Sequence, residues 1–214
     1  MENQIKEQAD KWRGIFGKDY TDRNPQTISE MENLYIKNFG VRRTELNSEF
    51  LEGLSKDMKI LEVGCNVGTQ LRVLESQGFT NLTGIEVQDY AVGVARNLSP
   101  KINFVVGSAL NLPFEDNSFD LVFTAGVLIH INPKDLDKVL REIHRVSKKY
   151  IWGYEYFSEE YKEIDYRSNK ELGWKNDFLG AYMGKFSDLN LLKEKKIDYL
   201  DDSNTDHMFL LKKV

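Results

Sequence analysis

The sequence predicts a doubly wound α/β fold with a mostly parallel sheet of seven strands. Between residues 59 and 157, short apolar runs alternate with segments whose apolar residues recur at helical spacing. The runs are continuous rather than alternating, which is typical of parallel strands covered by helices on both faces. Two further apolar runs near the chain end are joined by the turn sequence DDSNTD, which predicts an antiparallel pair at one side of the sheet.

A helical segment is expected before the first strand. Apolar residues recur at helical spacing over residues 3–16 and 27–54, with a break at Gly40. We therefore expect a helical cap over residues 1–56 and a core over 57–214, both within a single domain of 214 residues.

The core is expected to alternate strands with helices. Strands are predicted at KILEV (59–63), NLTGIEV (81–87), INFVVG (102–107), FDLVFTAGVL (119–128) and KYIWGYEYF (149–157). Helices are predicted at TQLRVLESQG (69–78), DYAVGVARNLS (89–99) and PKDLDKVLREIHRVS (133–147). The final strand pair is expected within 191–200 and 207–214. The connection at 157–188 is long for a simple crossover and is interpreted as an insertion.

Composition restricts the class of protein. The formal net charge of −5 offers no basic surface for nucleic acid, and no apolar run approaches the roughly 20 residues of a membrane span. The polar N-terminus MENQIKEQADKW lacks the apolar core of a signal peptide, and a single cysteine suits a reducing compartment. We therefore expect a cytoplasmic protein with no membrane partner. Three scattered histidines and one cysteine predict no metal site.

The loop after the first predicted strand is the first sign of a ligand site. In ILEVGCNVGTQL (60–71), Gly64 and Gly68 separate a buried strand from a helix that begins at once. Glycines are expected there when something lies against the backbone that a Cβ would block. Glu86 ends the second strand about 20 residues after Gly64, which is where the ribose-binding acid of a nucleotide site belongs.

The pattern of this loop indicates which cofactor is bound. A dinucleotide site needs G-x-G-x-x-G, whereas residues 62–68 read E-x-G-x-N-x-G. This pattern resembles motif I of the class I S-adenosylmethionine (SAM)-dependent methyltransferases, and the resemblance extends over residues 58–150. It implies SAM as cofactor and S-adenosylhomocysteine (SAH) as product. The implied cofactor contacts in and after the strands are Glu62, Gly64, Cys65, Asn66, Gly68, Glu86, Val87, Ser108, Ala109, Leu110 and Ala125.

Two of these contacts need comment. Ser108 stands where the commoner class pattern has an acidic residue, so the adenine contact departs from the family pattern. Cys65 is interpreted as a small structural side chain beside the cofactor and not as a nucleophile.

Three stretches resemble the pseudaminic acid biosynthesis-associated methylases more closely. They are WRGIFGKDYTDRN (12–24), GVLIHINP (126–133) and YEYF…EIDYR (154–167). The resemblance implies that Tyr20 and Arg23 close over the methionine end of SAM; the alternative is that Tyr20 only packs and Arg23 is solvated. It also implies a nonulosonic acid, or its nucleotide-activated form, as the acceptor in surface-glycan synthesis.

Methyl transfer from a sulfonium needs an oriented acceptor and, for some acceptors, removal of a proton. The candidates for these roles are polar residues at the ends of the fourth and fifth strands, namely His130, Glu155 and Tyr156. His130 could act as a base or could only bind the backbone and shape its loop, and both interpretations stay open.

The insertion at 157–188 mixes aromatic and charged residues, which suits a lid over a polar acceptor. Tyr166, Arg167 and Trp174 are expected to bind this acceptor. Arg167 could pair with a carboxylate or phosphate of the acceptor, or could make only a structural ion pair.

The leading functional hypothesis is a SAM-dependent methyltransferase that acts on a small polar acceptor, a sugar by resemblance. The alternatives are methylation of a protein, an RNA or another metabolite, and a non-catalytic SAM-binding module. The acidic charge counts against RNA, and the intact Gly64, Gly68 and Glu86 count against a module that has lost activity. Neither the methylated atom nor the oligomeric state follows from the sequence.

Overall fold

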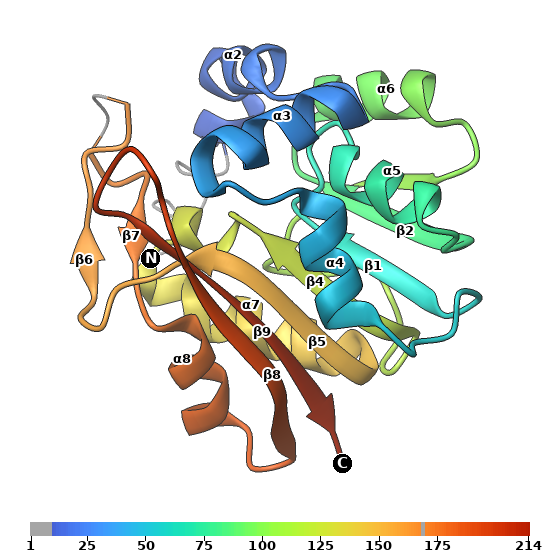
Figure 1. The fold of residues 1–214 in the computed structure, drawn as a ribbon, viewed down its shortest axis with the longest axis vertical. Coiled ribbons are helices and arrows are strands. Elements are labelled where there is room, and N and C mark those ends of the chain that lie inside the picture. Colours follow the sequence, from blue (N-terminus) through green and yellow to red (C-terminus); the bar gives the residue numbers. More distant parts are fainter. Residues whose placement is uncertain (1–9, 168–169) are drawn as a thin grey trace.

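The computed structural model describes residues 10–167 and 170–214, and seven of their strands form one mixed sheet in the order β3-β2-β1-β4-β5-β9-β8 (Figure 1). The parallel strands are β1 (Lys59–Val63), β2 (Asn81–Glu86), β3 (Asn103–Val106), β4 (Phe119–Ala125) and β5 (Ser147–Tyr156). Strand β9 (Thr205–Lys213) runs antiparallel between β5 and β8 (Leu189–Asp198). The doubly wound, mostly parallel sheet with an antiparallel C-terminal strand is confirmed.

The chain first winds outward from β1 through β2 to β3 and then returns to place β4 on the other side of β1. The described helices are α2 (Ile15–Arg23), α3 (Ile28–Phe39), α4 (Arg43–Leu51), α5 (Thr69–Ser76), α6 (Asp89–Leu98), α7 (Pro133–Val146), α8 (Phe178–Lys185) and the 3-10 helix η1 (Leu128–His130). Because the strand order reverses between β1 and β4, their carboxyl ends open the crevice in which such sheets bind ligands.

Helices cover both faces of the sheet (Figure 1), and each face has its own hydrophobic core. Ile60 points into the core formed with α3, α4, α5 and α6, whereas the next residue, Leu61, points into the core formed with α7 and α8. This alternation along β1 is the period-2 pattern of a strand. Both faces are covered, which explains why the strand sequences read as continuous apolar runs.

Local signals set the ends of the N-terminal helices. At the start of α3, Thr27 Oγ1 accepts a hydrogen bond from the Glu30 N–H (3.1 Å), and the Glu30 carboxylate accepts one from the Thr27 N–H (2.9 Å). This capping box satisfies N–H groups that have no partner within the helix. The helix ends at Gly40 in the left-handed conformation (φ 70°), as the sequence break there predicts.

Three expected elements differ from the structure or extend beyond it. The helix expected over 3–16 begins outside the described residues. The fourth strand ends at Ala125 rather than at residue 128, because Gly126 adopts φ 66° and turns the chain into η1. The connection at 157–188 contains the hairpin of β6 (Lys162–Glu163) and β7 (Trp174–Lys175), followed by α8, which packs on the sheet as an ordinary crossover helix.

Within residues 10–167 and 170–214, no helix combines the length and apolar character that crossing a membrane requires. The same residues contain no group of three or more His, Cys, Asp or Glu side chains placed to hold a metal ion.

Candidate cofactor and acceptor site

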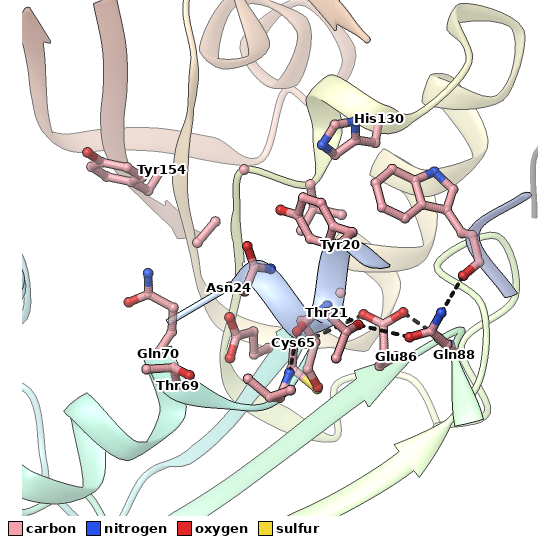
Figure 2. A pocket seen from close by; sticks show the side chains of 18 of the residues that line it. Tyr20, Thr21, Asn24, Cys65, Thr69, Gln70, Glu86, Gln88, His130 and Tyr154 are labelled. Atoms are coloured by element: carbon pink, nitrogen blue, oxygen red, sulfur yellow. Dashed lines mark hydrogen bonds between the residues drawn. The ribbon is translucent and has the colours of Figure 1, made fainter. Parts of the chain in front are cut away.

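A cavity of about 340 Å³ lies at the carboxyl ends of the parallel strands, beneath the N-terminal helices α2 and α3. Its walls come from the loops that follow β1, β2, β3 and β4, from the end of β5, and from α2 and α3. In Figure 2, Glu86 and Gln88 lie on one side of the cavity and Tyr154 on the other. The cavity therefore has two ends. We call the one at the glycine loop the nucleotide end and the one at β5 the β5 end.

The two glycines of the loop are required by the fold itself. Gly64 (φ 76°) and Gly68 (φ 73°) both adopt the left-handed conformation that side chains disfavour. A Cβ on Gly64 would lie 2.7 Å from the Val127 side chain, and one on Gly68 would lie 2.5 Å from the Phe104 ring. Gly68 does not line the cavity. The expectation that a ligand lies against both glycines therefore fails at Gly68, where packing against Phe104 explains the residue.

Glu86 lies at the cavity wall and is held in place by the backbone. Its Oε2 accepts a hydrogen bond from the Asn66 N–H (3.0 Å), and its Oε1 accepts from the N–H groups of Val87 (2.8 Å) and Gln88 (3.1 Å). Burial raises the pKa of the carboxyl, and these three bonds act in the opposite direction. A carboxylate offers about four lone-pair positions, and three are used here, so Oε2 can still accept a hydrogen bond from one ligand hydroxyl.

Glu62 supplies a second carboxylate at the nucleotide end. The side chain is buried on β1 and lines the cavity, and its Oε2 has no hydrogen-bond partner among the described residues. Burial raises its pKa well above the usual range, while Arg43 and Arg72 lower it. A buried carboxylate oxygen without a partner fits a positively charged or N–H-bearing group of a ligand.

The remaining predicted residues of the nucleotide end lie together. The cavity wall includes Cys65, Asn66, Val87, Ser108, Ala109, Leu110 and Ala125. Ser108 uses its hydroxyl to accept a hydrogen bond from the Leu110 N–H (3.2 Å), which shapes the loop after β3. Cys65 is buried, and Gly84 gives it space, because a Cβ there would lie 2.6 Å from its Sγ.

A chain of hydrogen bonds fastens the N-terminal segment over the loop. Asn66 Nδ2 donates to Thr21 Oγ1 (3.0 Å), Thr21 Oγ1 donates to Gln88 Oε1 (2.8 Å), and Gln88 Nε2 donates to the Trp12 carbonyl (2.9 Å). Figure 2 shows this connection beside Glu86. The residues before the first strand therefore form a wall of the cavity, and their position depends on side chains of the core. Sequence reasoning missed Thr21 and Gln88.

Tyr20 and Arg23, which were expected to contact the cofactor together, lie in different surroundings. Tyr20 lines the cavity, and burial raises its pKa. Arg23 is exposed and does not line the cavity, because it falls on the outer side of α2. The expected contact between Arg23 and the cofactor has no support in this geometry.

His130 lies in a set of aromatic rings at the top of the cavity (Figure 2). Its ring centroid is 4.7 Å from Trp12, 4.5 Å from Tyr166 and 6.3 Å from Tyr20. The Nδ1 atom lies 2.7 Å from the Leu172 carbonyl oxygen, so Nδ1 carries the proton. Burial lowers the pKa of His130 to about 4. The ring is therefore neutral near pH 7, and a pKa this low makes it a weak base there.

Glu155 and Tyr156 point in opposite directions from β5. Tyr156 lines the cavity, and burial raises its pKa to about 12. Glu155 is only 1% exposed and does not line the cavity. Its carboxylate accepts hydrogen bonds from the N–H groups of Val127 (3.2 Å) and Leu128 (3.0 Å). Contrary to the expectation of a catalytic role, Glu155 holds the loop that carries His130.

The expected lid contributes less than its sequence indicates. Tyr166 lines the cavity beside His130. Arg167 is exposed, adopts φ 52° and does not line the cavity, and Trp174 is buried on β7 away from it. Of the three residues predicted to bind the acceptor, Tyr166 alone reaches the cavity.

Sequence reasoning missed most of the β5 end of the cavity. The residues there include Tyr35 and Phe39 from α3, Tyr154 from β5, Tyr199 after β8 and Asp206 from β9. Asp206 lies opposite Tyr156 in the antiparallel register. A pairing between β5 and the last strand brings these residues together, and no local sequence pattern indicates which positions will face each other.

The central part of the chain resembles known methyltransferases. Residues 61–150 match the family model described as "Methyltransferase domain". This match spans about two fifths of the chain and includes the glycine loop, Glu86 and the strands β1 to β4. Among solved structures, a SAM-dependent methyltransferase from Methanosarcina mazei has a TM-score of 0.65 at 18% identity, covering 79% of this chain and 97% of that one. SAM is the methyl donor of that neighbour.

Curated relatives of the methyltransferase domain include sterol methyltransferases. The sterol 24-C-methyltransferase ERG6B of Gibberella zeae is 37% identical over 102 residues, which are 45% of this chain and 26% of that protein. The sterol 24-C-methyltransferase erg6 of Schizosaccharomyces pombe is 30% identical over 184 residues, which are 78% of this chain and 47% of that protein. The chain thus spans less than half the length of either relative.

Proposed function

We propose that the protein transfers a methyl group from SAM to a small polar acceptor bound in the same cavity. The observation that carries this proposal is the continuity of one cavity from Glu86 at the nucleotide end to Tyr154 and Asp206 at the β5 end. A cofactor on the glycine loop occupies the first part of such a cavity and leaves the second to an acceptor. Binding both in one cavity fixes their orientation relative to each other.

The residues at the nucleotide end fit SAM. Glu86 would accept a hydrogen bond from a ribose hydroxyl through the remaining lone pair of Oε2, and the unpartnered Oε2 of Glu62 would receive the ammonium group of the methionine part. Ala109 and Leu110 offer an apolar contact for adenine. Bound SAM supplies an electrophilic methyl group on a sulfonium. The chain's own residues then need only to hold the acceptor in line, which Tyr20, His130 and the β5 end can do.

For the acceptor we retain the class expected from the sequence, a sugar. Tyrosine rings from α3, β5 and the segment after β8 line the β5 end and offer faces on which the apolar side of a sugar ring can pack. Asn24 and Asn38 add amide groups that can bind hydroxyls. Among the described residues, however, no Lys or Arg side chain lines the cavity. The lining therefore supports a neutral or amino sugar better than a nonulosonic acid, whose carboxylate has no cation to meet there.

An apolar ring compound such as a sterol is a second candidate acceptor. Met31, Leu34 and Phe39 line the same end of the cavity and would contact apolar carbon. The sterol methyltransferases among the relatives add support for this class.

Calorimetric titration with SAM and SAH tests the cofactor half. We expect both to bind the wild type, and Glu86→Gln to bind roughly 10-fold to 100-fold more weakly, because it loses a charge-assisted hydrogen bond. Glu75→Gln is the matched control, because Glu75 lies on α5 outside the cavity. If neither compound binds the wild type, the proposed function is wrong.

Formation of SAH, followed while acceptors are added one at a time, tests the acceptor half. The panel contains amino sugars, nucleotide-activated sugars, nonulosonic acids and a sterol. Turnover with a sugar supports the first candidate, and turnover with the sterol alone replaces it with the second.

A further inference from the structure

Asp206 is the buried acid of the cavity that the cofactor does not need. Glu62 and Glu86 are the other carboxylates in the described lining, and both lie at the nucleotide end. Asp206 stands at the start of β9, opposite Tyr156, and is 3% exposed. A carboxyl group this deeply buried needs partners, since desolvation disfavours its charged form.

The protein partners of Asp206 do not use all of its hydrogen-bonding capacity. Tyr199 Oη donates to Asp206 Oδ2 at 3.3 Å. Neither Asp206 Oδ1 nor the hydroxyl of Tyr154, which also lines the cavity, makes a hydrogen bond of good geometry among the described residues, although the Tyr154 hydroxyl lies near enough to the carboxyl group to lower the pKa of Asp206. Buried polar atoms are normally hydrogen-bonded. The carboxyl group of Asp206 and the hydroxyl of Tyr154 lie together on the cavity wall and retain hydrogen-bonding capacity. Together they indicate a place for a polar ligand group.

Two cations lie near Asp206, and both are outside the cavity. Arg43 is fully buried, places its guanidinium carbon 4.5 Å from the Tyr154 ring centroid and donates to Tyr35 Oη (2.8 Å). Lys175 lies 5.6 Å from the Tyr156 ring centroid and donates to Asn204 Oδ1. Neither side chain lines the cavity. The ligand therefore meets tyrosine rings and a carboxyl group, and not a cation.

This arrangement has a preferred ligand chemistry. A group with an N–H or O–H can donate to Oδ1, and an ammonium also gains from the electron-rich faces of the tyrosine rings. A carboxylate or phosphate would lie against the Asp206 carboxyl with no cation in the described lining to balance it. Burial raises the pKa of Asp206 to about 7, so the carboxylate form predominates at pH 8.

We propose that Asp206 is the acceptor-binding acid of this protein, and that it selects an acceptor which presents an amine or hydroxyl hydrogen to Oδ1 and carries no negative charge. The inference deepens the proposed methyltransferase function and rests on it. It concerns the acceptor alone, so it can fail while the cofactor half stands.

Ligand-observed NMR at pH 8, with the protein saturated in SAH, tests the inference on probes that differ in one group. One series is cyclohexylamine, cyclohexanol and cyclohexanecarboxylate, and the other is glucosamine, glucose and glucuronate. We expect the amine or the alcohol of at least one series to bind wild type about tenfold or more tightly than the matching carboxylate.

Two variants separate this role from a structural one. Asp206→Asn should weaken the amine or alcohol about tenfold and reduce the preference over the carboxylate, with SAH affinity unchanged. Asp198→Asn is the matched control, because Asp198 is exposed at the end of β8 and its bond from Thr205 Oγ1 (2.7 Å) can be kept by asparagine. We expect it to behave as wild type.

Three outcomes would overturn the inference. They are equal or tighter binding of the carboxylates to wild type, no binding of any amine or alcohol, and an unchanged preference in Asp206→Asn. If the wild type does not bind SAH at all, the result counts against the proposed function itself.

Discussion

The side-chain hydroxyl of Thr21 donates a 2.8 Å hydrogen bond to Oε1 of Gln88, which joins the N-terminal helix α2 to the segment that follows β2. Thr21 is fully buried, and Gln88 continues the connection to the Trp12 carbonyl. The wall of the cavity above the glycine loop is therefore fixed to the same segment that carries Glu86. Cofactor binding and the order of α2 should depend on each other.

Gln88→Ala tests this coupling. The variant loses the hydrogen bonds to Thr21 and Trp12, each contributing about 1 kcal/mol, so we expect SAH to bind roughly 10-fold more weakly in calorimetric titration. Gln77→Ala is the control, because Gln77 also bonds a backbone carbonyl, that of Thr44, but lies outside the cavity. It should lower stability and leave SAH affinity unchanged. Equal SAH affinity in both variants and the wild type would contradict the coupling.

A pair of glycine substitutions tests why the loop needs glycine. Gly68 (φ 73°) and Gly78 (φ 92°) share the left-handed conformation, but a Cβ on Gly78 would meet no atom within 4 Å. Gly78→Ala should cost about 1–2 kcal/mol of unfolding free energy from strain alone. Gly68→Ala should cost about 1–3 kcal/mol more from the clash with Phe104. Urea unfolding measures both, and equal costs would show that the clash is relieved without strain.

Glu155 should make stability depend on pH. Its pKa is raised from 4.5 to about 8 by burial, so the folded state binds a proton more tightly than the unfolded state does. The contribution of this group is complete below pH 4.5 and is lost as pH rises to about 8, at up to about 1.4 kcal/mol per pH unit. Because glutamine does not titrate, wild type should lose stability relative to Glu155→Gln between pH 5 and 8. If the difference in unfolding free energy between wild type and Glu155→Gln stays constant from pH 5 to 8, the pKa of Glu155 is not raised. The hydrogen bonds from Val127 and Leu128 would then offset the effect of burial on that pKa.

His130→Asn distinguishes the two roles left open for this residue. Asparagine can place a donor near the position of Nδ1 and keep the bond to the Leu172 carbonyl, but it has no basic nitrogen. Since the pKa of His130 is lowered to about 4, we expect turnover within about threefold of wild type and unchanged SAH affinity. A loss of about 10²-fold or more in turnover, the size typical of a removed general base, would assign proton transfer to His130.

The fold could be predicted well from the sequence, because its signals are local. Apolar runs gave the strand positions, and Gly40 and Pro133 gave helix ends. Part of the nucleotide end could also be predicted: Glu86 from its spacing after Gly64, and Glu62 from the resemblance of its loop to a family motif. Both residues line the cavity.

The acceptor end lay beyond such reasoning, because long-range pairing creates it. Asp206 reaches the cavity only through the register of β9 on β5, and Tyr199 only through the turn after β8. Arg43 shows the same limit: a charged residue at the start of a helix is expected to be solvated, yet it is fully buried between aromatic rings. Arg167 shows the opposite case: it was expected in the cavity but is exposed outside it. The sequence of a connection does not indicate which of its side chains will point toward the cavity.

The most direct test of the central claim is mass spectrometry of acceptors after incubation with SAM that carries a deuterated methyl group. The acceptors are amino sugars and neutral sugars, with nonulosonic acids, a sterol, a peptide and RNA as comparators. We predict a product that carries the intact deuterated methyl on an amine or hydroxyl of an acceptor without negative charge, and at least tenfold less of it with Asp206→Asn. Two results would contradict the account. One is deuterated methyl found only on an anionic acceptor, and the other is no labelled acceptor at all although SAM binds.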